Sequence, residues 1–129
     1  MNPLDKLVSQ TGVKKAWLNR ELGIAWGTID NAYKRTGRLS IELADKLEDF
    51  LYSKGKDLNK FYVKDLRTDI HYLHEAYGIS KSSWATAAGI APGCLYYRLK
   101  AQSSGPEELI DNINAIKASR AKALMEFCA

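Results

Sequence analysis

The sequence contains little cysteine: Cys94 and Cys128 are the only two in 129 residues. Two cysteines are too few for the disulfide framework that stabilises small secreted domains, so we interpret both as reduced thiols. A metal site made by His71, His74 and a cysteine is the weaker alternative to two surface histidines, because zinc sites are usually built from paired, closely spaced ligands. The sequence therefore predicts no metal and no cofactor.

Long apolar runs are missing as well. No run approaches the ~20 apolar residues of a membrane span, and residues 1–5 lack the charged and then apolar pattern of a secretion signal. We therefore expect a cytoplasmic protein with no membrane partner. The chain also has no glycine-rich phosphate loop, no nucleophile with a matching base and no cluster of carboxylates, so we do not expect an enzyme.

An excess of positive charge is missing from most of the chain. Lys and Arg number 19 against 15 Asp and Glu, for a net charge of +4, and residues 53–64 carry most of that surplus, with four basic side chains and one acidic. Net charge is therefore a weak argument for nucleic-acid binding. Apolar residues make up 46% of the chain, which is enough to bury a core.

What the sequence does contain is a pattern that occurs twice. Residues 14–34 read KKAWLNRELGIAWGTIDNAYK, and residues 80–100 read SKSSWATAAGIAPGCLYYRLK, 66 positions later. Each segment predicts a short amphipathic helix, a glycine turn and a second short helix. The glycines that end the preceding helices, Gly12 and Gly78, fall in the same register, and so do Lys15 and Lys81. Because chance rarely aligns so many turn residues, we interpret the chain as a duplication.

The turns carry a family resemblance. Gly23-Ile24 and Gly89-Ile90 stand at the corners, and an apolar residue follows six places after each glycine, at Ile29 and Leu95. On these residues the chain resembles the helix-turn-helix DNA-binding proteins of the small phage-repressor type. The resemblance implies an all-α fold, with two tandem four-helix helix-turn-helix units, in which the second helix of each motif lies in the major groove of double-stranded DNA.

Carried over to this sequence, the resemblance assigns the DNA contacts to the outer residues of two recognition helices near 26–34 and 92–100. Asn31 suits a bidentate contact with adenine, Lys34 and Lys100 suit guanine or phosphate, and Asp30 suits only a cytosine amino group. The full set is Trp26, Gly27, Thr28, Asp30, Asn31, Lys34, Arg35 and Arg38 in the first copy, and Pro92, Gly93, Tyr96, Tyr97, Arg98 and Lys100 in the second.

The domain boundaries follow from changes in composition. We expect a first domain at 1–54, a basic linker at 55–64 in which Gly55 ends the preceding helix, and a second domain at 65–117. The lysines at and around this linker either contact phosphates or keep a solvated connector soluble. They are Lys54, Lys56, Lys60 and Lys64.

The last segment, 118–129, is predicted to be a C-terminal helical extension beyond the repeat. Its apolar residues, flanked by Lys117, Arg120 and Lys122, require a partner. Either the segment folds back on the first domain, or it pairs with its copy in a homodimer. The apolar residues concerned are Ala121, Leu124, Met125 and Phe127.

Two hypotheses on function remain open. The first is a sequence-specific transcriptional regulator, a repressor of phage or mobile-element origin acting in a bacterial cell or a phage-infected host. The second is a phage-encoded inhibitor that uses the same scaffold to bind a host protein or nucleoprotein complex, with Trp26, Tyr96 and Tyr97 as anchors.

Overall fold

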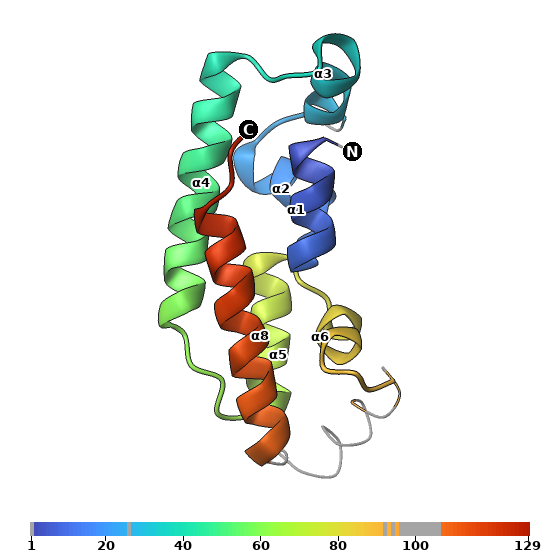
Figure 1. Ribbon diagram of the computed structural model, residues 1–129, viewed down its shortest axis with the longest axis vertical. Coiled ribbons are helices and arrows are strands. Elements are labelled where there is room, and N and C mark those ends of the chain that lie inside the picture. Colours follow the sequence, from blue (N-terminus) through green and yellow to red (C-terminus); the bar gives the residue numbers. More distant parts are fainter. Residues whose placement is uncertain (1, 26, 92, 94, 96–106) are drawn as a thin grey trace.

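The computed structural model describes residues 2–25, 27–91, 93, 95 and 107–129, and the regular elements in them are α-helices (Figure 1). In chain order they are α1 (Pro3–Thr11), α2 (Lys15–Leu22), α3 (Thr28–Thr36), α4 (Ile41–Lys60), α5 (Leu66–Tyr77), α6 (Lys81–Ala87) and α8 (Glu107–Met125). The prediction of an all-α fold is confirmed. Of the second recognition segment only Gly93 and Leu95 are described, so the second four-helix unit remains a prediction. Among these helices none is both long and apolar enough to cross a bilayer.

The helices begin and end at residues that the sequence marks. Before α1, Asn2 Oδ1 accepts a hydrogen bond from Asp5 N at 2.8 Å, and before α4, Ser40 Oγ accepts one from Leu43 N at 3.3 Å. Such side chains satisfy backbone amides that have no partner within the helix. At its other end α1 stops at Gly12, whose φ of 76° is costly for residues with a Cβ.

The helices match in pairs at an offset of 66 residues. α1 ends at Thr11 and α5 at Tyr77, α2 begins at Lys15 and α6 at Lys81, and α4 begins at Ile41 and α8 at Glu107. The hydrogen bonds of the two turns match as well. They run from Ile24 N to Asn19 O at 2.9 Å, and from Ile90 N to Ala85 O at 3.0 Å.

Two pairs of equivalent residues touch each other. Val13 and its counterpart Ile79 form an isolated antiparallel β-bridge, and a Cβ added to Gly55 would lie 2.8 Å from the carbonyl oxygen of its counterpart Ala121. A residue in contact with its own counterpart lies beside the axis of a two-fold rotation. These two contacts therefore mark a local two-fold axis inside a single chain.

The contacts around this axis are reciprocal. Gly12 lies against the side chain of Ser83, and its counterpart Gly78 lies against Trp17, the counterpart of Ser83. Reciprocity of this kind is the property of an isologous interface between two subunits. Here both surfaces belong to the same molecule.

The prediction of a linker at 55–64 is wrong for residues 55–60, because α4 continues through Gly55 to Lys60. Glycine inside a helix costs about 1 kcal/mol relative to alanine, and that local cost was the basis of the prediction. In the structure the missing side chain lets the backbone of α8 approach α4, and Gly55 is buried. Packing of the two long helices offsets the cost, and residues 61–65 make the connection to α5.

The C-terminal segment does not extend beyond the repeat. α4 has 20 residues and its counterpart α8 has 19, so 118–125 is the second half of a helix that both copies possess. Ala121 and Leu124 are buried, and Met125 and Phe127 pack partly buried against the same core. The fold-back alternative therefore describes the chain, because the face assigned to a homodimer is covered by the protein's own α4 and α1 (Figure 1).

Two cations expected at the edge of that face are buried instead. Lys117 is 4% exposed and Arg120 is 7% exposed. Lys117 Nζ donates to Leu58 O at 2.9 Å, at the C-terminal end of α4, where free carbonyls and the helix dipole favour a positive charge. The guanidinium of Arg120 lies 4.4 Å from the ring centroid of Trp84. Burial lowers the pKa of both side chains.

The contact at Gly55 gives a stability prediction. The methyl group of Gly55→Ala would push α4 and α8 apart, so the free energy of unfolding should fall by about 1–3 kcal/mol, although the same change in an unpacked helix raises it by about 1 kcal/mol. Urea unfolding followed by circular dichroism measures the difference. Ser53→Ala, at an exposed position of the same helix, is the control and should change stability little. A more stable Gly55→Ala variant would contradict the packing of α8 on α4.

Candidate nucleic-acid interface

Helix α3 is anchored on one side and open on the other. Ile29 and Tyr33 point into the core and are 1% and 5% exposed, and their spacing of four residues places them on one face of the helix. Gly27 precedes α3 and Gly37 follows it, with φ of 79° and 74°. The two buried side chains and two sharp turns fix the orientation of the helix, which lies near one end of the molecule (Figure 1).

The outer face of α3 carries most of the residues that the resemblance assigned to DNA in the first copy. Those that the structure describes as exposed are Thr28, Asn31, Lys34, Arg35 and Arg38. Gly27 and Asp30 are half-buried, and Trp26 lies outside the described residues. Among the described residues, none covers these side chains of α3, the predicted recognition helix, or of the turn after it.

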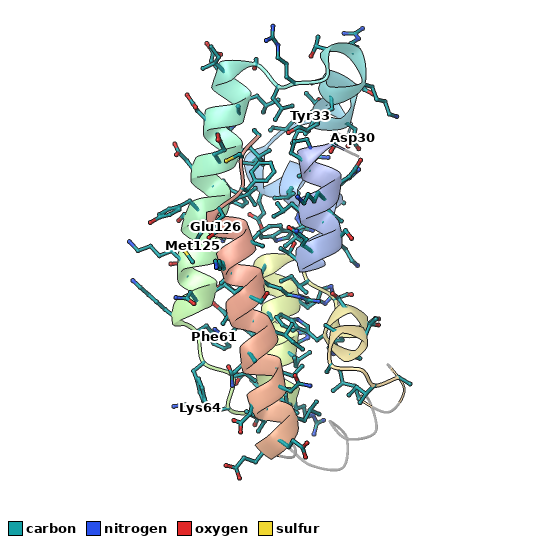
Figure 2. All side chains as sticks on the ribbon, viewed as in Figure 1. Asp30, Tyr33, Phe61, Lys64, Met125 and Glu126 are labelled. Atoms are coloured by element: carbon teal, nitrogen blue, oxygen red, sulfur yellow. The ribbon has the colours of Figure 1, made fainter. Side chains whose placement is uncertain are left out.

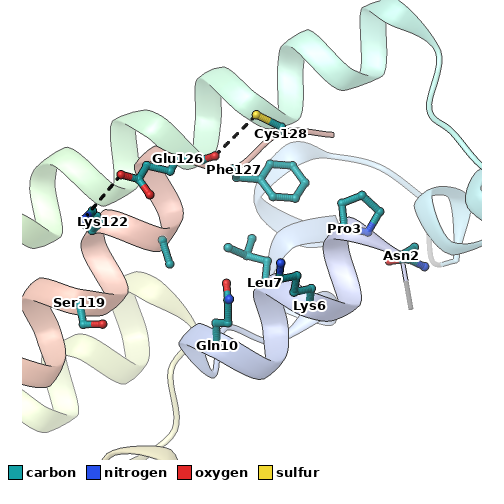
Figure 3. Close-up of a pocket in the computed structure, with 11 residues that line it drawn as sticks. Asn2, Pro3, Lys6, Leu7, Gln10, Ser119, Lys122, Glu126, Phe127 and Cys128 are labelled. Carbon is teal, nitrogen blue, oxygen red and sulfur yellow. Dashed lines mark hydrogen bonds and ion pairs between the residues drawn. The ribbon is translucent and has the colours of Figure 1, made fainter.

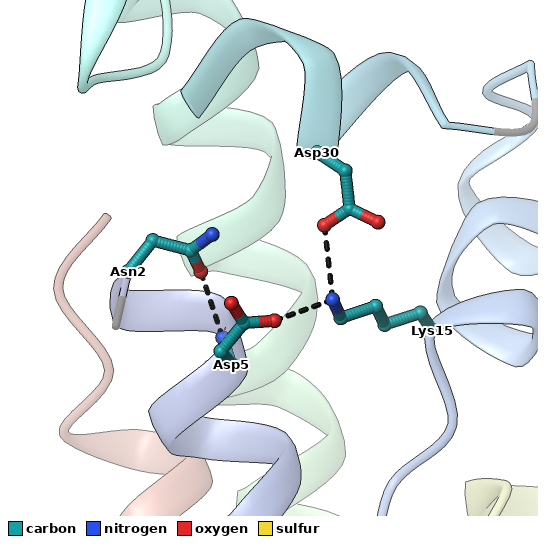
Figure 4. Close-up of polar contacts among 4 residues, drawn as sticks. All are labelled: Asn2, Asp5, Lys15 and Asp30. Carbon is teal, nitrogen blue, oxygen red and sulfur yellow. Dashed lines mark hydrogen bonds and ion pairs between the residues drawn. The ribbon is translucent and has the colours of Figure 1, made fainter. Parts of the chain in front are cut away.

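Lys15 connects α3 to the body of the domain. Its Nζ forms an ion pair with Asp5 of α1 and donates to Asp30 Oδ1 of α3 at 3.1 Å (Figure 4). The hydrogen bond to Asp5 and then the contacts with Asp30 raise the pKa of Lys15 above its usual value. Lys15 therefore offsets part of the negative charge of Asp30, which lessens the repulsion between this carboxylate and a phosphate.

Lys15 was missed as a functional residue in the sequence, where it was noted only as one member of a repeated pair. Its partners lie 10 residues before it and 15 residues after it, on two other helices. Neither spacing is a helical i, i+3 or i, i+4 relation. The one available signal was an acidic residue near the start of α3, which is a common and unspecific feature.

Gly27 owes its place to backbone conformation. A Cβ at this position would meet only the side chain of Asn31, at the ordinary contact distance of 3.7 Å, so close packing does not demand glycine there. Glycine is required there by its left-handed φ of 79°, which residues with a Cβ rarely adopt. Gly93, its counterpart in sequence, has open space around it and does not share that positive φ. Gly27 and Gly93 therefore differ in backbone conformation.

The second recognition segment is described only at its start. Gly89 turns with a φ of 76°, Leu95 is buried with 1% exposure like its counterpart Ile29, and Gly93 is exposed. The other residues assigned to DNA in this copy lie outside the described residues. They are Pro92, Tyr96, Tyr97, Arg98 and Lys100.

The lysines of the expected linker do not gather beside α3. Lys54 is half-buried, and its Nζ lies 5.9 Å from the ring centroid of Trp17 and 5.7 Å from that of Phe50, so its charge interacts with aromatic rings. Lys56, Lys60 and Lys64 are exposed. Figure 2 shows Lys64 near the end of the molecule opposite to α3, just after the C-terminus of α4.

A groove opens between α1 and the C-terminal segment (Figure 3). Its walls mix apolar and charged side chains, including Leu7 and Phe127, and an ion pair of Lys122 with Glu126 at 4.0 Å. None of its lining residues belongs to α3. The groove is therefore separate from the surface assigned to DNA.

Comparisons with protein-family models, curated proteins and solved structures found no match to the chain. The resemblance to helix-turn-helix proteins accordingly rests on the residues of the two turns alone.

The ion pairs of Lys15 give a second prediction. Lys15→Met should lower the free energy of unfolding at pH 7 by less than about 1 kcal/mol, since all three side chains are partly exposed. Because the folded state raises the pKa of Lys15, this stabilisation is present below pH 10.5 and disappears as the pH rises through the raised pKa. It should also shrink in 1 M salt.

The measurement is urea unfolding of the wild type and the variant at pH 7 and at a series of pH values above 10.5. Lys6→Met, which removes an exposed lysine of α1, is the matched control. An equal loss for both substitutions, or a loss that does not diminish across that series, would contradict the assigned role of Lys15.

Proposed function

We propose that this protein is a sequence-specific DNA-binding regulator that places α3 in the major groove. The observation that carries the proposal is the outer face of α3, where the exposed side chains are neutral or basic and the half-buried carboxylate of Asp30 is turned to Lys15. An α-helix fits the width of the major groove, and a rigid helix can hold its side chains against base edges.

Each exposed residue has a contact that suits its chemistry. Asn31 can donate to and accept from adenine at once, and Lys34 or Arg35 can donate to guanine. Arg38 follows the helix and suits the phosphate backbone, which positions the protein without reading sequence. A protein bound in this way near a promoter would act as a repressor by occupying the site, and the resemblance to phage repressors points to a mobile-element origin.

The alternative is an inhibitor that binds a host protein. It depends mainly on Trp26, Tyr96 and Tyr97 as exposed anchors, and these lie outside the described residues. Its other arguments are the modest net charge, the acidic Asp30 and the basic Arg98 at a position that is usually apolar in helix-turn-helix proteins. Lys15 pairs with both Asp5 and Asp30, so it offsets the charge of Asp30 only in part. The exposed basic residues on the outer face of α3 favour DNA binding over this alternative.

A double substitution tests the proposal. Asn31→Ala with Lys34→Ala should weaken binding to the DNA upstream of the protein's own gene at least about 10-fold, because each base contact contributes about 1–3 kcal/mol. Fluorescence anisotropy over a range of salt concentrations measures the affinity, which should fall steeply as salt rises for the wild type.

The control is Asn112→Ala with Lys122→Ala, which removes the same two residue types from exposed positions of α8. It should leave affinity nearly unchanged. Equal losses in the two double variants would show a general effect of charge, and unchanged binding in the α3 variant would remove α3 as the recognition helix.

A further inference from the structure

We infer that the groove between α1 and the C-terminal segment binds a small aromatic molecule that carries a negative charge, with its ring against Phe127 (Figure 3). This site is independent of the proposed function, because none of its lining residues belongs to α3. Support for it comes from the equivalent place in the second copy, where the protein supplies an aromatic ring of its own.

The equivalent place lies between α5 and the end of α4, and an aromatic pair occupies it. The ring centroids of Phe61 and Tyr72 are 5.0 Å apart, with an angle of 35° between the ring planes. Tyr72 is 45% exposed, so this ring lies at the surface of the protein. Aromatic rings at such distances stabilise each other beyond the effect of the area that they bury.

The first copy has only half of this pair. The counterpart of Phe61 is Phe127, but the counterpart of Tyr72 is Lys6. Lys6 and Phe127 both line the groove, and no aromatic pair among the described residues includes Phe127. A flexible lysine with a strongly hydrated ammonium group does not cover the face of a ring as a phenol does. The groove therefore opens at the position from which the second copy extends its ring.

The backbone holds the two phenylalanines in equivalent positions. Phe61 N donates to Leu58 O at 3.2 Å, and Phe127 N donates to the counterpart carbonyl, Leu124 O, at 3.5 Å. Each of these bonds lies at the C-terminal end of a long helix, α4 in one copy and α8 in the other. Figure 3 shows the ring of Phe127 turned toward α1.

The facing helices also match. Leu7 and Leu73 follow Lys6 and Tyr72 in the sequence, and they are buried with 2% and 0% exposure. α1 and α5 therefore turn the same side to the core. The Cα–Cβ bonds of Lys6 and Tyr72 accordingly leave their helices in equivalent directions, and the difference between the two places is the side chain itself.

The groove has the size and the charge for the proposed ligand. Its volume is about 710 Å³, within the range of about 300–1,000 Å³ that is usual for small-molecule sites. Leu7 and Phe127 give it apolar surface, and Lys6 and Lys122 add two positive charges against the single negative charge of Glu126. A carboxylate on the ligand can pair with an ammonium group of the groove, whereas a cation would meet net repulsion.

A titration of the full-length protein tests the site. The probe is 3-(4-hydroxyphenyl)propionate, which carries the phenol of a tyrosine and a carboxylate, and 3-cyclohexylpropionate is the matched probe without an aromatic ring. Nuclear magnetic resonance shifts of backbone amides report binding even when it is weak. The aromatic probe should shift the amides of Leu7, Ser119 and Phe127 saturably, and the cyclohexyl probe should bind at least about 2-fold more weakly.

Two substitutions of Lys6 separate the space for a ring from the charge. Lys6→Tyr places in the groove the residue that the second copy has at this position, so it should weaken binding of the aromatic probe at least about 10-fold and raise the urea midpoint of unfolding. Lys6→Met keeps the space and removes a charge, so it should weaken binding of the propionate but not of uncharged p-cresol. Lys56→Tyr, at an exposed position of α4 outside the groove, is the control and should leave binding unchanged.

Different results would overturn different parts of the proposal. The absence of saturable shifts in the groove, or equal weakening by Lys6→Tyr and Lys56→Tyr, would reject the site. Equal affinity for the two propionates would reject the aromatic ligand. If Lys6→Tyr does not fold, Lys6→Met decides, since an unchanged affinity for the propionate would reject the charged ligand. A wild-type dimer in light scattering that Lys6→Tyr abolishes would assign the groove to a second copy of the chain instead.

Discussion

The close approach of α4 to α8 at Gly55 is the constraint on which the arrangement of the two copies depends. A side chain at that position would collide with the backbone of Ala121, so the two longest helices can meet there only because residue 55 is glycine. Their contact, together with the bridge between Val13 and Ile79, fixes the axis that relates the copies. The relative positions of the turns at Gly23 and Gly89 follow from that axis.

Local structure was predictable from the sequence because its causes are local. The cap at Ser40, the glycine turns at Gly23 and Gly78, and the buried faces of α3 and α5 each depend on residues within one or two helical turns. The 66-residue offset also predicted which helices correspond, and the structure places their ends in that register where it describes them. All-α architecture followed from the same signals.

The errors share a different cause, because each involves a contact between distant segments. Gly55 was expected to end a helix since propensity counts only the cost within α4, whereas the benefit comes from α8. The 3.6-residue period predicted Lys117 at the edge of an apolar face. In the structure it is buried, because carbonyl groups at the end of α4 accept hydrogen bonds from its ammonium group. The role of Lys15 was hidden because its two carboxylate partners lie on two other helices.

Carrying both copies in one chain permits an asymmetry that a homodimer cannot have. In a dimer of identical subunits the two contacts across the axis must be the same, whereas here Gly78 faces the ring of Trp17 and Gly12 faces the small side chain of Ser83. In a homodimer one substitution changes both subunits, whereas here a substitution changes one copy alone. The outer faces of the two copies can therefore differ, as the two halves of the interface do. A tandem chain can therefore keep matched turns at Gly23 and Gly89 while its two copies carry different residues at equivalent positions, such as Asn31 and Tyr97.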